Sequence, residues 1–463
     1  MVEPEELLEI DNGAVVAPAG HGKTEVIARV AALSRRALIL THTHAGVHAI
    51  KARLRRMGVP QDKAVVDTIA GWSTRYARAF PSVAEPPEGL PQTGAEWDQL
   101  YRGATLAIQV SAVQSVVRAS YDRVLIDEYQ DCGHLQHELA VGISALVPTL
   151  IFGDPLQGIF EFAGATLNWD SDIHPAFPLV GTLDTPHRWK GINPDLGEWI
   201  AETRLKLLAG NTIDLNDPRI TYRECENQFD MDTLFDGFDE REGSVAAIHC
   251  NKKICYGLAK ASSGGYQAIE EFAAGALREF SEKWDRAVDA EERRIVILAF
   301  IKGCFKTGKL AEDEVVAPEL EAALASLRML VPQLGEANGA SVAVSIMSTI
   351  RKHPTYKLYR AELLRDAERA LAELEAGRSA TLSQAAEVIR QRTSMLGRNL
   401  PRRTVATPLL LKGLEFDHVV IPDATHFSRE RLAQGKLFYV AISRATKSLT
   451  IASSSRELRF PVP

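Results

Sequence analysis

Short apolar runs alternate with helical segments over the first part of the chain. From Gly13 to about Tyr76, an apolar strand, a glycine turn and a helix are followed by a second apolar strand and a second helix. This alternation is typical of βαβ units, which build a parallel sheet with helices against its faces. Strand-like apolar runs recur at residues 124–127, 149–153, 244–248 and 419–421. The pattern therefore predicts an α/β protein with parallel sheets.

Two stretches of different composition interrupt this alternation. Residues 81–95 are rich in proline and glycine and begin a small insertion over residues 81–118. Residues 265–398 are largely amphipathic helix and interrupt a second α/β region. The predicted domains are a first lobe of residues 1–80 and 119–180, the insertion of residues 81–118, a second lobe of residues 181–264 and 399–463, and the helical insertion of residues 265–398.

The composition is that of a folded protein, with 46% hydrophobic and 24% charged residues in 463. The net charge of −7 means that contacts with nucleic acid would have to come from local lysines and arginines. The five cysteines include no CxxC pair, and we expect Cys132 to be a small buried residue. No signal peptide or membrane-spanning apolar run is present. These features indicate a reduced, cytoplasmic protein without a zinc ribbon, an iron–sulfur cluster or a membrane contact.

The first candidate site is the segment 17–24, APAGHGKT, which lies between a short apolar strand and a helical stretch. A glycine loop in this context can wrap backbone N–H groups around phosphate oxygens at the start of a helix. Lys23 would neutralise the β and γ phosphates of ATP, and the Thr24 hydroxyl would bind Mg²⁺. The alternative is a glycine turn without a ligand. The residues expected around the nucleotide are Gly20, His21, Gly22, Lys23 and Thr24.

A second apolar run, residues 124–128, ends in two acidic residues. Such a strand places one carboxylate near Mg²⁺ and a second near the attacking water. We assign the metal side to Asp127. Glu128 is the candidate for orienting and deprotonating water. The alternative is an acidic strand end that faces solvent.

The segment 127–131, DEYQD, resembles motif II of the superfamily-one helicases of the UvrD, PcrA and Rep family, where the usual form is DEFQD. Further segments resemble other motifs of this family in the family's order. They are residues 41–45 (THTHA), 68–72 (TIAGW), 153–157 (GDPLQ) with 159–162 (IFEF), 185–188 (TPHR), 411–416 (LKGLEF) and 439–445 (YVAISRA). The resemblance implies two RecA-like P-loop lobes that hydrolyse Mg·ATP in a cleft and act on single-stranded DNA in the 3′ to 5′ direction.

The resemblance also implies roles for single residues. Arg188 and Arg444 match the family's two arginines that meet the γ-phosphate, where a guanidinium stabilises developing charge. Gln157 matches the glutamine that links the γ-phosphate to the DNA side, and Gln130 matches another interdomain polar contact. Glu415 matches the acid expected near the ribose. Each of these side chains taken alone would be an ordinary solvated surface group.

Motors of this type hold a single strand by stacking bases on aromatic rings and by touching phosphates with hydroxyl groups. His42 stands where the family usually has phenylalanine, and it offers less area for stacking. The alternative for Trp72, Phe160 and Phe162 is that they are core residues. The candidates for DNA contacts are Thr41, His42, Thr43, Thr68, Trp72, Phe160 and Phe162.

Several positions depart from the family's pattern. No glutamine occurs in residues 1–13, so the sequence leaves the choice of nucleotide open. Ala163 and His249 replace arginines of the family, and the segment 407–411 lacks its histidine. His21 in the phosphate loop is expected to face solvent more readily than phosphate. The departures fall mainly on DNA-coupling positions, so ATP hydrolysis is better predicted than processive unwinding.

The trimmed insertions resemble the compact helicase-like subunit of the Gabija antiphage system, which works beside an OLD-family nuclease with a Toprim domain. This resemblance implies a nuclease partner that docks on the helical insertion, and a role in antiphage defence or DNA repair. Two rival hypotheses remain open at this point. One is an ATPase subunit that senses DNA or nucleotides and regulates the nuclease without unwinding, and the other is an RNA-directed motor.

Overall fold

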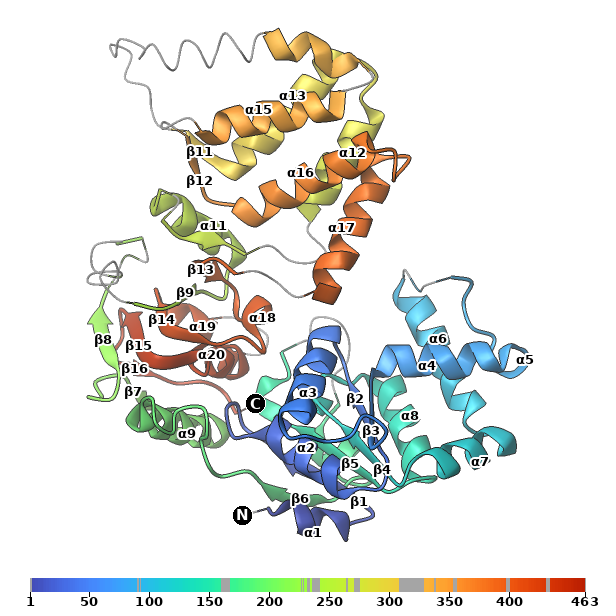
Figure 1. Ribbon diagram of the computed structural model, residues 1–463. Helices are drawn as coiled ribbons and strands as arrows, with labels where there is room; N and C mark the ends of the chain where they lie inside the picture. Colours follow the sequence, from blue (N-terminus) through green and yellow to red (C-terminus); the bar gives the residue numbers. More distant parts are fainter. Residues whose placement is uncertain are drawn as a thin grey trace. The chain divides into compact units, whose positions relative to one another are not determined.

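The computed structural model of the chain is shown in Figure 1. It describes residues 2–462 except 90, 92, 160–166, 226, 228, 231–233, 235–241, 264, 270–274, 308–328, 337–338, 353–355, 397–399 and 430–433. Among the described helices, none is long and apolar enough to cross a membrane. Contacts between residues divide the chain into two units, which are described separately.

The first unit comprises residues 1–214, 428–447 and 457–463 and is built on a six-stranded sheet. The paired strands of this sheet run parallel, in the order β3-β2-β4-β5-β1-β6. The central strands are continuous apolar runs because helices cover both of their faces. The strands are β1 (Asn12–Val16), β2 (Ala37–Thr41), β3 (Ala64–Thr68), β4 (Arg123–Ile126), β5 (Thr149–Gly153) and β6 (Leu179–Thr182).

Helices cover the two faces of this sheet. One buried core joins the strands to α1 (Pro4–Leu8), α2 (Lys23–Leu33) and α3 (His44–Arg56). A second core, on the other face, joins them to α4 (Ile69–Ala79), α6 (Gly94–Ala107), α7 (Ser111–Ser120) and α8 (His134–Ser144). The same unit contains α5 (Pro81–Ala84), α9 (Pro194–Ala209), α20 (Gln434–Ile442), the 3-10 turns Tyr129–Asp131 and Pro155–Gln157, the π-helical turn Trp169–Ile173 and the short strands β7 (Ile213–Asp214) and β16 (Glu457–Leu458).

The second unit, residues 215–427 and 448–456, contains another six-stranded sheet in the order β10-β13-β9-β14-β15-β8. The pairs β10–β13, β13–β9, β9–β14 and β15–β8 are parallel, which confirms the α/β class predicted for both regions. Its strands are β8 (Thr221–Glu224), β9 (Val245–Ile248), β10 (Gln267–Ala268), β13 (Arg403–Ala406), β14 (Phe416–Ile421) and β15 (Ala445–Ser453), and its short helices are α11 (Lys252–Ala261), α18 (Pro408–Leu411) and α19 (Thr425–Arg429).

A group of helices in this unit has a core of its own. Trp284, Phe300 and Met347 are among its buried residues. Its amphipathic helices bury one apolar stripe each and turn their charged residues outward, as the sequence pattern requires. The elements are α12 (Gly275–Arg286), α13 (Ala290–Cys304), α15 (Gly339–Lys352), α16 (Ala361–Glu375), α17 (Leu382–Leu396), the 3-10 turn Val331–Gly335 and the antiparallel pair β11 (Phe305–Thr307) and β12 (Tyr356–Leu358).

The small segment predicted as an insertion packs on the first sheet. Ala104 of α6 and Val117 of α7 belong to the core on the α4 face. Helix α6 also lies close to α5, since a Cβ placed on Gly103 would overlap the carbonyl oxygen of Ala84. Glycine at this position therefore allows close approach of the two helices.

We predict that Gly103→Ala lowers the free energy of unfolding by about 1–3 kcal/mol, because the added methyl group overpacks a backbone contact. Gly94→Ala is the matched control, since a Cβ there meets no atom within 4 Å. It should leave stability unchanged or raise it by up to about 1 kcal/mol through helix propensity. Urea unfolding of the two variants, followed by circular dichroism, compares them. Equal midpoints would contradict the close approach of α5 and α6.

Candidate functional site

The loop between β1 and α2 has the backbone of a phosphate site. Gly20 and Gly22 have φ values of 76° and 84°, a region that favours glycine. Gly22 is the N-cap of α2, and no side chain caps the first turn of this helix. The N–H groups of that turn and the positive end of the helix dipole therefore suit an anion.

A segment of the same unit packs directly on this loop. A Cβ on Gly20 would lie 2.7 Å from the Trp189 ring and 2.8 Å from Cβ of Arg188, and one on Gly22 would lie 3.0 Å from His187. The backbone N–H of Arg188 donates to the carbonyl oxygen of Gly20 at 2.9 Å. Glycine is therefore required in the loop both for its φ and for the close neighbour.

Lys23 lies between the two acids that follow β4. Its Nζ is 2.9 Å from Oδ1 of Asp127, and it also pairs with Oε1 of Glu128. The side chains of Lys23 and Asp127 are only 13% and 7% exposed, whereas that of Glu128 is 31% exposed. Burial acts to lower the pKa of Lys23, but the two carboxylates outweigh burial and raise that pKa above its ordinary value. Lys23 is therefore a firmly charged cation at the start of α2.

Glu128 is held in an uncommon conformation. Its φ is 55°, in the left-handed region that a residue with a side chain seldom adopts. The Gln130 side chain donates from Nε2 to its Oε2. A strained residue with two side-chain partners is a fixed one, and such strain is typical of functional sites.

The residues around Lys23 fit a magnesium nucleotide. Thr24 in the first turn of α2 offers a hydroxyl and Asp127 a carboxylate, the hard oxygen ligands that Mg²⁺ prefers. Over the described part of the chain, no group of three or more His, Cys, Asp and Glu residues could hold a metal ion by itself. Mg²⁺ in nucleotide sites is usually bound through one or two carboxylates together with substrate phosphates, and the Thr24 and Asp127 oxygens fit that arrangement.

A buried polar network continues from these acids. Asp154 is fully buried, and its Oδ1 pairs with Nη2 of Arg204 at 2.9 Å. Its Oδ2 accepts from Nε2 of Gln157 at 3.1 Å, and its backbone N–H donates to Oε1 of Gln130 at 3.0 Å. Gln130 thus joins Glu128 to the segment that follows β5.

The network closes on the phosphate loop through Tyr439 of α20. The backbone N–H of Ala19 donates to the Tyr439 hydroxyl at 3.1 Å, and Arg204 is hydrogen-bonded to the same hydroxyl. Burial raises the pKa of Tyr439, so the phenol stays neutral. The path Glu128, Gln130, Asp154, Arg204, Tyr439 and Ala19 therefore connects the acid of motif II with the loop by direct contacts.

Residues 89–177 match the family model of the UvrD/REP helicase N-terminal domain, and residues 410–452 match that of the UvrD-like helicase C-terminal domain. These two stretches of the chain thus match models of UvrD-like helicase domains. The expected resemblance to superfamily-one helicases is thereby confirmed. No curated protein sequence matches the chain significantly.

Two helicases are among the solved structures similar to this UvrD-like chain. The arterivirus nonstructural protein 10 helicase, solved with DNA, is 14% identical over 53% of this chain and 49% of its own, with a TM-score of 0.27. The Pif1 helicase from Candida albicans is 13% identical over 57% of this chain and 53% of its own, with a TM-score of 0.31. The chain thus spans about half the length of each of these structures.

The two arginines predicted from the sequence both form hydrogen bonds with Ser443. The Arg188 guanidinium donates to the carbonyl oxygen of Ser443. Arg444 is 1% exposed, and it donates from Nε to the carbonyl oxygen of Val440 at 2.9 Å and from Nη2 to the Ser443 hydroxyl at 2.7 Å. Their contact with the γ-phosphate stays a prediction. Glu415 is exposed, just ahead of β14 in the second unit, and its role near the ribose also stays a prediction.

The expectation that His21 faces solvent is wrong. Its side chain is 5% exposed, and its Nδ1 lies 2.9 Å from the carbonyl oxygen of Ala19. Burial lowers the pKa of His21 and favours the neutral ring. The short loop is covered by residues 187–189, which the sequence places far away. Cys132 is buried, as expected.

Among the predicted DNA contacts, Trp72 is fully buried and packs on Tyr76 with ring centroids 4.3 Å apart. A base cannot stack on a ring without exposed surface, so the alternative of a core residue accounts for Trp72. His42 is half-buried, with Nε2 3.4 Å from Sγ of Cys132. Phe160 and Phe162 lie outside the described residues.

The three threonines differ in exposure. Thr43 is exposed and caps α3 by accepting from the N–H of Gly46 at 3.0 Å. Thr68 is buried and caps α4 by accepting from the N–H of Gly71 at 2.9 Å. Thr41 is 1% exposed. A capping role explains two of these hydroxyl groups without DNA.

Sequence reasoning missed Arg204, Asp154 and Tyr439 as members of the site. A signal for Arg204 exists in α9, because Leu196, Ile200 and Arg204 share one stripe at four-residue spacing. A charged residue within an apolar stripe indicates a buried partner. The identity of that partner depends on the fold, since Asp154 is 50 residues away.

We predict that Arg204→Met lowers the free energy of unfolding by about 3–5 kcal/mol, because it leaves the buried Asp154 carboxylate without its cation. Adding Asp154→Asn to Arg204→Met should restore part of this loss. Lys206→Met on the same helix is the control and should change stability by less than about 0.5 kcal/mol. Thermal unfolding measures all three proteins. An Arg204→Met protein as stable as the control would contradict the importance of the pair.

Proposed function

We propose that this chain is an ATP-dependent motor of the UvrD type that moves along single-stranded DNA in the 3′ to 5′ direction. The observation that carries the proposal is the position of Lys23, at the uncapped start of α2 and between Asp127 and Glu128. The UvrD-like domain matches support the same activity.

Nucleotide binding would rearrange the charges around Lys23. The first-turn N–H groups of α2 and the Lys23 ammonium group would take the β and γ phosphates, in exchange for the carboxylates that Lys23 now holds. Thr24 and Asp127 would hold Mg²⁺, and the ion would supply positive charge against the charge that develops on the transferred phosphoryl group. The site thus keeps a positive charge facing the acids in both states.

Release of Lys23 to the phosphates would leave the Glu128 carboxylate free to act on water. Gln130 and the left-handed backbone hold this side chain in place, and a base must lie within hydrogen-bond reach of the water that it deprotonates. Arg188, Arg444 and Gln157 would stabilise charge on the transferred phosphoryl group. The buried network would carry the change in Glu128 to Asp154 and Tyr439.

The DNA contacts proposed for the chain are His42 for stacking, the exposed Thr43 for phosphates, and Phe160 and Phe162 from the segment 159–162. Thr41 and Thr68 are left out because they are buried. Trp72 is not among them, because it has no exposed surface. Adenine selectivity is left open, since the chain lacks the family's glutamine in residues 1–13.

The burial of Trp72 favours a second candidate function. A chain that has lost a stacking position and carries alanine at position 163 would grip DNA weakly, yet it retains the phosphate chemistry. Such a chain would serve as a DNA-sensing ATPase that regulates a partner nuclease, as in the Gabija-type arrangement of antiphage defence. Strand displacement by the chain alone separates this function from that of a motor.

We predict that the purified chain hydrolyses ATP, that single-stranded DNA stimulates the rate, and that Lys23→Ala and Glu128→Gln each reduce it about 100-fold or more. Lys302→Ala, an exposed lysine of α13, is the control and should keep the full rate. Phosphate release with DNA, with RNA and without nucleic acid measures the coupling. Stimulation of hydrolysis by RNA but not by DNA would identify RNA as the substrate strand. A hydrolysis rate that neither nucleic acid changes would favour the regulatory function.

His42→Ala should raise the DNA concentration needed for half-maximal stimulation roughly fivefold or more, because base stacking contributes about 1–3 kcal/mol per base. His44→Ala is the control, since His44, the first residue of α3, is exposed two residues after His42 and is not assigned to DNA. Titration of ATPase activity with an oligothymidylate compares the two variants. Equal titration curves would remove His42 from the DNA track.

A further inference from the structure

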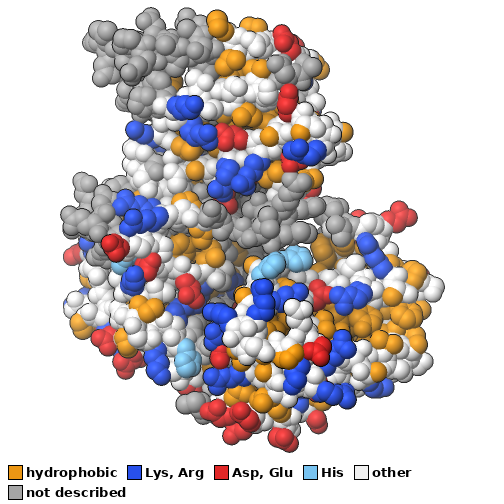
Figure 2. All heavy atoms as spheres, in the orientation of Figure 1, with side chains coloured by type: hydrophobic (Ala, Val, Ile, Leu, Met, Phe, Trp, Pro, Cys, Tyr) orange, Lys and Arg blue, Asp and Glu red, His pale blue; other side chains and the backbone are white. Residues whose placement is uncertain are grey.

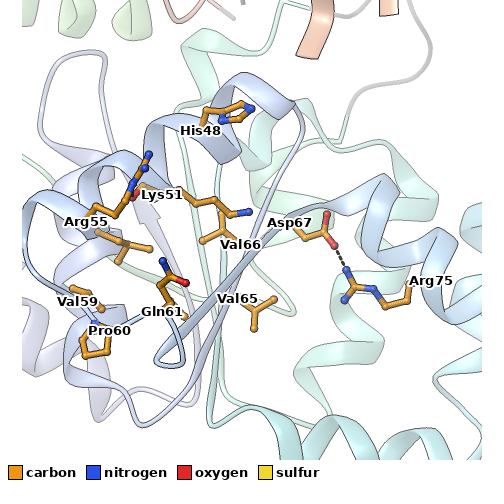
Figure 3. Close-up of a pocket in the computed structure, with 12 residues that line it drawn as sticks. His48, Lys51, Arg55, Val59, Pro60, Gln61, Val65, Val66, Asp67 and Arg75 are labelled. Atoms are coloured by element: carbon orange, nitrogen blue, oxygen red, sulfur yellow. Dashed lines mark hydrogen bonds and ion pairs between the residues drawn. The ribbon is translucent and has the colours of Figure 1, made fainter. Parts of the chain in front are cut away.

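A groove of about 650 Å³ runs along the edge of the first sheet. Its floor includes β3, which lies at the end of the strand order and, among the described strands, pairs with β2 alone. Helix α3 and the loop after it form one side, and Arg75 of α4 lies on the other (Figure 3). An edge strand beside open space is a site where a further strand can add.

The side chains of β3 alternate between two different surroundings. Val66 belongs to the core on the α3 face, whereas Val65 packs against the core on the α4 face. A strand added beside β3 would alternate in the same way, so its odd and even residues would meet different walls.

The wall on the α3 side is cationic. His48, Lys51 and Arg55 are exposed and lie three and four residues apart, which places them on one stripe of the helix. Basic side chains gather over this part of the surface in Figure 2. Within the part of the chain that the structure describes, no acidic side chain forms an ion pair with any of the three.

The wall on the α4 side differs in charge. Arg75 is paired with Asp67, so its charge is already neutralised (Figure 3). The groove surface beside this pair is apolar at Val65. An incoming strand would therefore meet free cations on one face and a mainly apolar, neutral surface on the other.

We propose that the edge of β3 binds an extended segment of a partner protein in which acidic and apolar residues alternate, by strand addition. Acidic side chains would face Lys51 and Arg55, and apolar ones would face Val65. No phenylalanine, tyrosine or tryptophan is among the described residues that line the groove, so base stacking would depend on the His48 imidazole alone. The apolar floor and the strand edge favour a peptide over a nucleic acid.

The spacing of the charges agrees with this mode of binding. Lys51 and Arg55 are separated along α3 by a rise of about 6 Å. Acidic residues at alternate positions of a strand are separated by about 6.6 Å. The five residues of β3 extend over roughly 16 Å. Two acidic residues of the added strand can therefore pair with Lys51 and Arg55 at once.

The proposal is tested with a fluorescent eight-residue peptide of alternating valine and glutamate, and with three other probes. These are the valine–lysine peptide, the valine–glutamate peptide with a central proline, and oligothymidylate. Binding to the full chain is measured by fluorescence anisotropy, and protection of the β3 amides by hydrogen exchange. The variant is Lys51→Glu/Arg55→Glu, and Arg102→Glu/Arg118→Glu, with the same change of charge on α6 and α7, is the control.

The expected result is saturable binding of the valine–glutamate peptide with protection of residues 64–68, weakened at least tenfold by the groove variant but not by the control. The groove variant should instead bind the valine–lysine peptide, which shows that it is still folded. The central proline should weaken binding, because it removes a backbone donor. Absence of binding, equal loss in both variants, or protection without dependence on Lys51 and Arg55 would overturn the proposal. Binding of oligothymidylate alone with the same dependence would assign the groove to nucleic acid and would also overturn it.

Discussion

The site depends on one electrostatic constraint, the burial of the Lys23 cation between two carboxylates. In a parallel sheet all strands end at the same edge, and the adjacent order β4-β5-β1 places the segments that follow these strands together. The lysine after β1 and the acids after β4 therefore meet although they are about a hundred residues apart. A buried cation without such partners would be very costly. The three charges hold one another in place. Their contacts can also be exchanged, because a phosphate can replace the carboxylates beside Lys23 and a metal ion can replace the ammonium group beside the carboxylates.

Hydrogen bonds and an ion pair from neighbouring side chains connect these three charges with the segment after β5 and with the phosphate loop. The Gln130 side chain is hydrogen-bonded to the Glu128 carboxylate and to the backbone N–H of Asp154. A movement of Glu128 would therefore displace the segment that follows β5. Arg204 pairs with Asp154 and contacts Tyr439, whose hydroxyl accepts from the phosphate loop. A buried ion pair contributes little net stability, but it is costly to break. Its value here is therefore in fixing geometry, since a displaced partner would leave a charge uncompensated inside the protein.

The sequence predicted the parts of the site that consist of adjacent residues. It did not predict the parts that form when distant segments of the chain pack together. The glycine loop, Lys23, Asp127 and Glu128 each belong to a strand followed by a loop, so a few adjacent residues define them, and the α/β class follows from the same alternation. The burial of His21 and the pairing of Arg204 depend on chain segments far away, which no local pattern identifies. The domain boundaries stay a prediction. The contacts of residues 181–214 and 428–447 group them with the first unit, because sheet edges and helix packing rather than composition decide where a unit ends.

The same distinction explains why phosphate binding is better predicted from this sequence than contact with DNA. Phosphate binding uses backbone N–H groups and charges whose positions the loop itself dictates. Stacking on DNA needs an aromatic ring that is exposed, and exposure is a property of the whole fold. Trp72 has the right residue type in the right motif, yet α4 turns it into the core beside Tyr76. An aromatic residue in a motif is therefore evidence for DNA contact only after its exposed surface is known. A lysine at the start of an uncapped helix is evidence for phosphate binding by itself, because the neighbouring backbone N–H groups and its charge are fixed locally.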